Sequence, residues 1–95
     1  MARIDLNSVT QLPDPLAEAR DPRAVIRETI GNIIDAGGVP NWKNVLWEAA
    51  GALYRRDRAY KTQDDAYAEI KRAAQAMSEA GELEANQTGP WRLLR

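Results

Sequence analysis

The chain has 95 residues, which suffices for one hydrophobic core and is too short for two. Hydrophobic residues make up 44% of it and charged residues 28%, a balance that excludes the low-hydrophobicity, high-charge composition of disordered chains. The 13 Lys and Arg residues oppose 14 Asp and Glu residues, so no whole-molecule field attracts nucleic acid or membrane, and any electrostatic binding must be local.

The residue types that most enzymes depend on are missing. The chain has no histidine and no cysteine, so it lacks the commonest acid-base group, a thiol nucleophile and the usual zinc ligands. The only adjacent carboxylates, Asp64 and Asp65, are explained by a place in the first turn of a helix. We therefore expect a protein without enzymatic activity, metal or cofactor. The absence of cysteine, of a long apolar stretch and of a secretory signal favours a cytoplasmic location.

We expect residues 1–21 to form an N-terminal arm and residues 22–95 to form the folded domain. The start of the arm is either a short strand at residues 3–6 or a segment laid on the core. Asp14-Pro15 predicts a short helical turn that stops before Pro22, because a residue preceding proline is pushed out of the α region.

Asp21-Pro22 predicts the start of the first long helix, which runs to about Ala36 and ends at Gly37-Gly38. Gly31 lies inside this helix, either to permit the close approach of another helix or as a tolerated surface glycine. The apolar positions that recur at the helical period are Val25, Ile26, Ile30, Ile33 and Ile34.

Asn41 predicts the cap of a second helix that runs to about Tyr54, and residues 55–62 then lose the helical pattern. Its predicted inner face comprises Trp42, Val45, Leu46, Ala49 and Leu53. Thr62 to Asp65 has the spacing of a capping box and starts a third helix that ends at Gly81. The inner face of the third helix comprises Ala66, Tyr67, Ile70, Ala73, Ala74 and Met77.

After Gly81 the apolar period changes to two, which predicts a β-hairpin. Gln87-Thr88-Gly89 forms its three-residue loop. Counting outward from this loop pairs Ala85 with Trp91, Leu83 with Leu93 and Glu84 with Arg92. The predicted fold class is mainly α with a small β-hairpin: a three-helix core and a C-terminal wing.

Three helices followed by a hairpin, with the junction Ala80-Gly81-Glu82-Leu83 and the returning strand Gly89-Pro90-Trp91-Arg92-Leu93, resemble the winged-helix family from about Pro22 onward. In that family the third helix enters the DNA major groove and the wing contacts the neighbouring backbone. The resemblance implies that the groove is faced by Gln63, Asp64, Ala68, Lys71, Arg72 and Gln75. It also places on or near the wing Gln87, Thr88 and Arg92.

The strongest local charge feature, which we call the basic segment, comprises residues 54–61. Its four cations and two aromatic rings suit phosphate contacts and base stacking. The candidate nucleic-acid-binding residues are Arg55, Arg56, Arg58, Tyr60, Lys61, Lys71, Arg72 and Arg92. Alternatively, the cations complement the dipole of the second helix and the tyrosines pack inward. A separate exposed stripe on the first helix comprises Arg20, Arg23 and Arg27.

A second feature favours a protein partner. Trp47 and Tyr54 lie two turns apart on a flank of the second helix with Gly51 between them, which predicts an aromatic-walled notch. Alternatively, the N-terminal arm covers this notch with Ile4, Leu6 or Val9.

These features support two functional hypotheses. The first is a winged-helix-like regulator that contacts DNA or RNA through the basic segment and the wing, as a dimer or within a larger complex. The second is an adaptor or inhibitor, of the size of small phage or plasmid regulators, that binds a partner protein or itself through helical and aromatic surface. The near-neutral charge and the acidic third helix favour the second.

Overall fold

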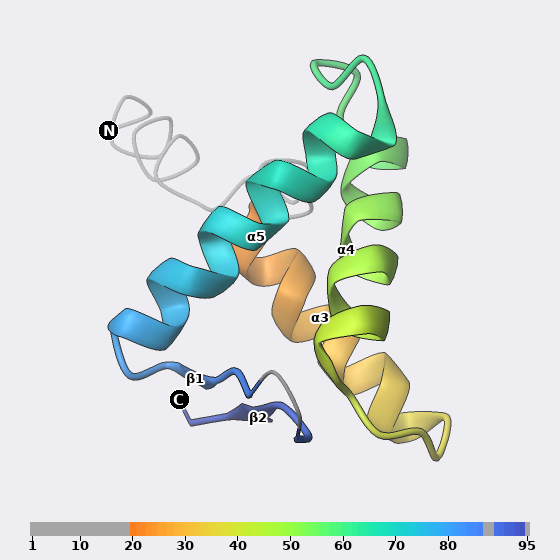
Figure 1. The fold of residues 1–95 in the computed structure, drawn as a ribbon. Helices are drawn as coiled ribbons and strands as arrows, with labels where there is room; N and C mark the ends of the chain where they lie inside the picture. The colour runs from red at the N-terminus through yellow and green to blue at the C-terminus, as the bar shows by residue number, and fades with distance from the viewer. Residues whose placement is uncertain (1–19, 87–88, 95) are drawn as a thin grey trace, which may run out of the picture.

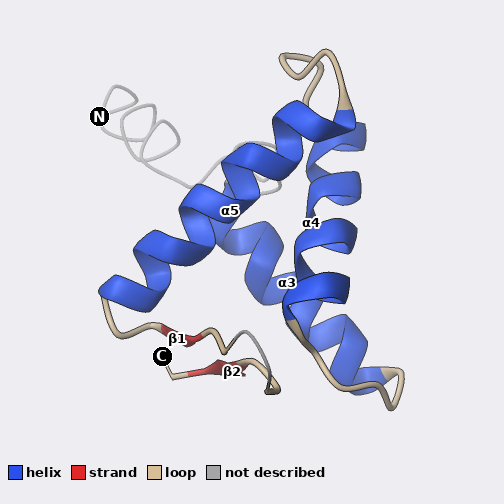
Figure 2. Ribbon diagram, in the orientation of Figure 1, coloured by secondary structure: helices blue, strands red, loops and turns tan. Residues whose placement is uncertain are grey.

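The computed structural model describes residues 20–86 and 89–94, in which three packed helices are followed by a two-stranded antiparallel hairpin (Figure 1; Figure 2). This confirms the predicted fold class. The elements are α3 (Pro22–Asp35), α4 (Trp42–Arg56), α5 (Gln63–Glu79), β1 (Leu83–Glu84) and β2 (Arg92–Leu93). The interpretations made for residues 1–19, and for Gln87 and Thr88 in the hairpin loop, lie outside the described residues. No helix in the described part of the chain is long and apolar enough to cross a membrane.

Polar side chains start the helices where the sequence predicts. The Asp21 carboxylate accepts a hydrogen bond from the backbone N–H of Arg23, and the Thr62 hydroxyl accepts one from Asp65. Asn41 and Asn44 each accept from the other's backbone N–H, which makes a reciprocal capping box. Because the first N–H groups of a helix have no partner inside the helix, these bonds fix where each helix begins.

Glycines end α3 and α5 in the same way. Gly37 and Gly81 have positive φ angles of 83° and 74°, which glycine adopts without steric cost. In each case the residue after the glycine donates to a carbonyl five positions earlier, as Gly38 N–H does to Ile33 and Glu82 N–H does to Met77. These are Schellman motifs, and they turn the chain sharply after each helix.

The prediction that α4 stops near Tyr54 is wrong, because the helix continues through Arg56. The N–H of Asp57 still donates to the carbonyl of Leu53. Arg55 and Arg56 therefore lie in the last helical turn, where cations interact favourably with the helix dipole. The loop to α5 is correspondingly shorter, at residues 57–62.

The core lies where the three helices converge and the hairpin closes over them. It contains Val25, Ile26, Ile30, Ile33, Val45, Leu46, Ala49, Ala50, Leu53, Ala66, Ile70, Ala74, Met77, Leu83 and Trp91. Two predicted core positions are exposed instead: Ile34 by 55% and Trp42 by 40%. Each lies at the edge of its apolar stripe, where no helix or strand among residues 20–86 and 89–94 covers it fully.

The hairpin has the predicted register, with Leu83 opposite Leu93 and Glu84 opposite Arg92. Leu83 is buried against the helices, whereas Leu93 is exposed. Trp91 anchors the hairpin, since its ring is 5% exposed, its indole N–H donates to Asn86 and its backbone N–H donates to Pro40. The bond to Pro40 ties the hairpin to the loop between α3 and α4.

Gly31 and Gly81 form a matched pair for testing backbone conformation. Apart from the adjoining backbone, a Cβ added at either meets no atom of the described residues within 4 Å. Gly31 is helical, so Gly31→Ala should stabilise the protein by up to about 1 kcal/mol. Gly81 has φ 74°, so Gly81→Ala should destabilise it by about 1 kcal/mol. Urea denaturation of both variants measures the two signs; equal effects would contradict the Schellman assignment.

Candidate functional site

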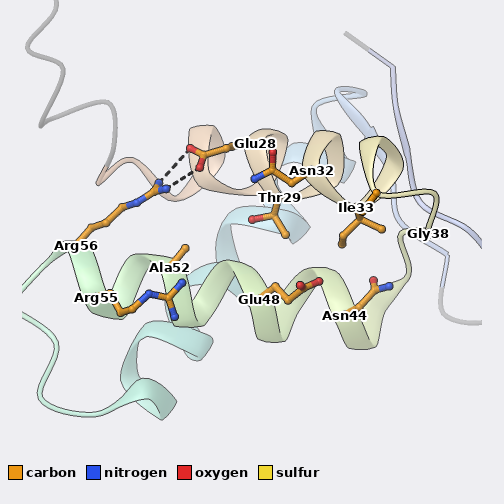
Figure 3. Close-up of a pocket in the computed structure, with 11 residues that line it drawn as sticks. Glu28, Thr29, Asn32, Ile33, Gly38, Asn44, Glu48, Ala52, Arg55 and Arg56 are labelled. Atoms are coloured by element: carbon orange, nitrogen blue, oxygen red, sulfur yellow. Dashed lines mark hydrogen bonds and ion pairs between the residues drawn. The ribbon is translucent and has the colours of Figure 1, made fainter.

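Arg56 of the basic segment is held by an ion pair inside the molecule. Its guanidinium donates two hydrogen bonds to the Glu28 carboxylate on α3, with N–O distances of 2.6 and 3.1 Å (Figure 3). This hydrogen bonding lowers the pKa of Glu28 and raises the pKa of Arg56. The paired geometry joins α3 to α4, so Arg56 serves the fold.

Arg55 and Gln63 cover the glycine of the predicted aromatic notch. A Cβ built on Gly51 would lie 3.2 Å from Arg55 Nη1 and 3.4 Å from Gln63 Nε2. Gly51 is accordingly buried, although Trp47 and Tyr54 on either side of it are 55% and 38% exposed. The space between these two rings is occupied by the chain's own polar side chains.

The remaining residues of the basic segment lie in the α4–α5 loop. The Asp57 carboxylate accepts from the N–H of Ala59, which tightens the turn. Arg58 and Lys61 are exposed, whereas Tyr60 is half-buried and packs against the core. Burial raises the pKa of Tyr60, and the negative charge of Glu69 raises it further. Tyr60 therefore packs inward, as the alternative interpretation of the basic segment expects. Arg58 and Lys61 face solvent.

The other predicted nucleic-acid-binding residues lie away from this loop. Lys71 and Arg72 are exposed on α5, and Arg72 pairs with Glu69 at 3.4 Å. Arg92 is exposed on β2. The α4–α5 loop precedes α5 and the hairpin follows it (Figure 1). The length of α5 therefore separates the loop cations Arg58 and Lys61 from Arg92.

The remaining α5 residues that the resemblance directed toward DNA differ in exposure. Asp64, Ala68 and Gln75 are exposed, and Gln63 is half-buried. Asp64 and Asp65 occupy the first turn of α5, where carboxylates complement the dipole. In the described residues, no three side chains of metal-ligating type gather.

The predicted arginine stripe on α3 is partly engaged within the fold. Arg23 and Arg27 both form ion pairs with Glu82, the residue that leads into β1. Arg20 is exposed and lies in the turn before α3, outside the helix. Two of the three arginines therefore hold the hairpin against the helices.

A groove of about 420 Å³, lined mainly by polar residues, lies on the surface where α3 and α4 pack together (Figure 3). The Glu28–Arg56 ion pair closes one end of it and Gly38 lies at the other. The groove is lined by Glu28, Thr29, Asn32, Ile33, Ala36, Gly38, Asn44, Glu48, Ala52, Arg55 and Arg56.

A second and larger hollow, of about 840 Å³, lies between α4, α5 and the hairpin, and we call it the aromatic groove. Figure 1 shows that α4 and α5 diverge from the loop that joins them and that the hairpin lies near their far ends. The lining residues are Trp42, Lys43, Leu46, Tyr67, Lys71, Ala74, Gln75, Ser78, Ala85 and Trp91. Leu46, Ala74 and Trp91 are buried and form its floor.

Trp47 extends this surface, because its ring packs against Tyr67 with centroids 6.2 Å apart and planes tilted by 57°. All three tryptophans of the chain therefore line the aromatic groove or adjoin it. The sequence interpretation missed this groove because it assigned Trp42, which is exposed, to the core. The available signal was the width of the apolar surface on α4, where Trp42, Leu46 and Trp47 exceed a single stripe.

Comparisons with known proteins do not assign a function to the aromatic groove. No protein-family model, curated protein or solved structure matches the chain. The two grooves are therefore interpreted from their own chemistry.

The Glu28–Arg56 pair should make stability depend on pH. The folded-state pKa of Glu28 lies below its ordinary value of 4.5, so the pair stabilises the protein above that value and loses its effect as the pH falls through the lowered pKa. Glu28→Gln should cost about 0.5 kcal/mol near neutral pH, because both side chains are partly exposed, and nothing in strong acid. Denaturant titrations across pH measure the difference.

Arg72→Gln is the matched control, since Arg72 pairs with Glu69 within one helix and its side chain is 73% exposed, against 33% for Arg56. That variant should change stability less. A Glu28→Gln cost that stays constant down to strong acid would contradict the role of the ion pair.

Proposed function

We propose that this protein is a binding module of winged-helix-like architecture that docks a partner protein on the aromatic groove. The observation that supports the proposal is that Trp42 and Trp91 line one groove and that Trp47 packs against Tyr67 on its wall. Tryptophan and tyrosine are enriched among the residues that dominate binding energy at protein interfaces. With no histidine or cysteine in the chain, the proposed role is recognition rather than catalysis.

The exposure of the rings supports this proposal. Trp42 is 40% exposed and Trp47 is 55% exposed, so both carry apolar area that a partner could remove from water. Apolar residues scattered singly over a surface are common and carry no functional meaning. Two large exposed rings beside one hollow form a patch, and such patches mark interaction sites. The groove also has a firm floor, because Trp91 is fixed by hydrogen bonds to Asn86 and Pro40. A preformed site loses little entropy on binding.

Nucleic-acid binding is the second candidate. Lys71, Arg72 and Gln75 are exposed on α5, and Arg92 is exposed on the adjoining hairpin, a placement suited to winged-helix docking. This candidate ranks second because Arg56 and Arg72 are engaged by carboxylates and because Asp64 and Asp65 open α5. In winged-helix docking α5 would enter the DNA major groove, and these carboxylates at its start would repel the DNA phosphates.

The docking proposal predicts that Trp47→Ala abolishes capture of a partner from lysate of the native host, in the presence of nuclease. Removal of this exposed ring, which packs against Tyr67 on the wall of the groove, should weaken binding by about 2 kcal/mol. Stability should fall by about 1 kcal/mol or less, because the ring is half-exposed. Affinity capture with mass spectrometry, alongside thermal melts, measures both effects.

Ile34→Ser is the matched control, since Ile34 has the same 55% exposure but lies on α3, whereas Trp47 packs against Tyr67 of the aromatic groove. It should retain the captured partner. Loss of capture by both variants would indicate a general effect of surface apolar area and contradict the proposal.

The nucleic-acid candidate predicts a different result. Lys71→Ala/Arg72→Ala should weaken duplex DNA or RNA binding and reduce the slope of log affinity against log salt by about 2. Fluorescence anisotropy over a salt series measures the slope, with Arg20→Ala as the control for loss of one exposed cation elsewhere. Binding that is absent from the parent protein would eliminate this candidate.

A further inference from the structure

The charged side chains that line the aromatic groove have one sign. Lys43 and Lys71 line it, from α4 and α5 respectively, and no carboxylate does so among the described residues. Both lysines are exposed, and neither forms an ion pair with a described residue. The surface is thus locally cationic on a chain whose net charge is −1.

The lysines lie above an apolar floor. Lys43 Nζ is 5.7 Å from the centroid of the Trp42 ring, and Lys71 stands on the opposite wall. Lysine stems cover apolar surface while their ammonium groups stay in water. The groove therefore combines buried Leu46, Ala74 and Trp91 below with an ammonium group on each side.

We propose that the occupant of the aromatic groove is an acidic segment of the partner protein, in which a bulky apolar side chain is flanked by carboxylates. This inference rests on the proposed function and identifies the chemistry of its partner. The apolar side chain enters between Trp42 and Tyr67 and supplies most of the affinity. The carboxylates approach Lys43 and Lys71, which sets orientation and speeds association.

The groove favours a peptide segment over nucleic acid for two reasons. Its floor is formed by one aliphatic side chain, one alanine and one ring, a shape that accepts a branched or aromatic side chain. It offers two cations, whereas binding along a nucleic-acid backbone requires a series of phosphate contacts.

The test is a charge reversal on the groove. A displayed library of random peptides of about 12 residues, long enough to span about 18 Å as a helix, is selected against the parent protein and against Lys43→Glu/Lys71→Glu. Peptides selected by the parent should be enriched in Asp and Glu beside Leu, Phe or Trp. Peptides selected by the reversed variant should be enriched in Lys and Arg at the same positions.

The reversal is suited to this purpose because it should leave the fold intact. Lys43 lies in the first turn of α4, where a carboxylate complements the helix dipole. Lys71 is exposed in the middle of α5. Lys61→Glu, in the α4–α5 loop, is the matched control and should select the same peptides as the parent.

Affinities of the selected peptides complete the test. A synthetic acidic peptide should bind Lys43→Glu/Lys71→Glu about tenfold more weakly than the parent, as followed by tryptophan fluorescence. The charge assignment would be overturned by peptides that require Trp42 but show no acidic bias. It would also be overturned by an acidic bias that persists in peptides selected by the charge-reversed variant. Either result would leave groove docking intact. Failure to select peptides sensitive to Trp42→Ala would overturn both. Binding of a fluorescent duplex that displaces the peptide and is lost on charge reversal would assign the groove to nucleic acid.

Discussion

The burial of Trp91 is the contact on which the arrangement of this molecule depends. A two-stranded hairpin with two residues per strand has little stability of its own, so it must be held by the helices. Trp91 provides this hold through a nearly buried ring and through hydrogen bonds to Asn86 and Pro40. The same ring forms part of the floor of the aromatic groove. The contact that closes the fold therefore also shapes the candidate binding surface.

Ion pairs engage three of the arginines in contacts between elements of the fold. Arg56 joins α4 to α3 through Glu28, while Arg23 and Arg27 hold Glu82 at the entry to the hairpin. Each of these pairs spans elements that are distant in sequence. Partly exposed ion pairs contribute modestly to stability, yet they fix orientation and withdraw cations from any external phosphate. The cationic character that remains around the aromatic groove comes from lysines.

Local rules predicted most of the fold and little of the candidate site. Asp21, Asn41 and Thr62 cap the helices as the sequence indicates, and Gly37 and Gly81 end two of them, because capping depends on residues close in the chain. The hairpin register followed from alternation and loop length. The exposure of Trp42 could not be derived in this way, because periodicity identifies an apolar face without showing whether a neighbour covers all of it.

The sequence by itself determined the secondary structure, the order of the elements and the pairing of Leu83 with Leu93, since each depends on hydrogen bonds and apolar periods over a few residues. The tertiary structure alone decided which cations pair and which rings stay exposed. Glu28 meets Arg56, and Trp47 meets Tyr67, only because α4 packs against α3 and diverges from α5 at particular angles. Those angles arise from the packing of side chains far apart in the sequence, which no local pattern records.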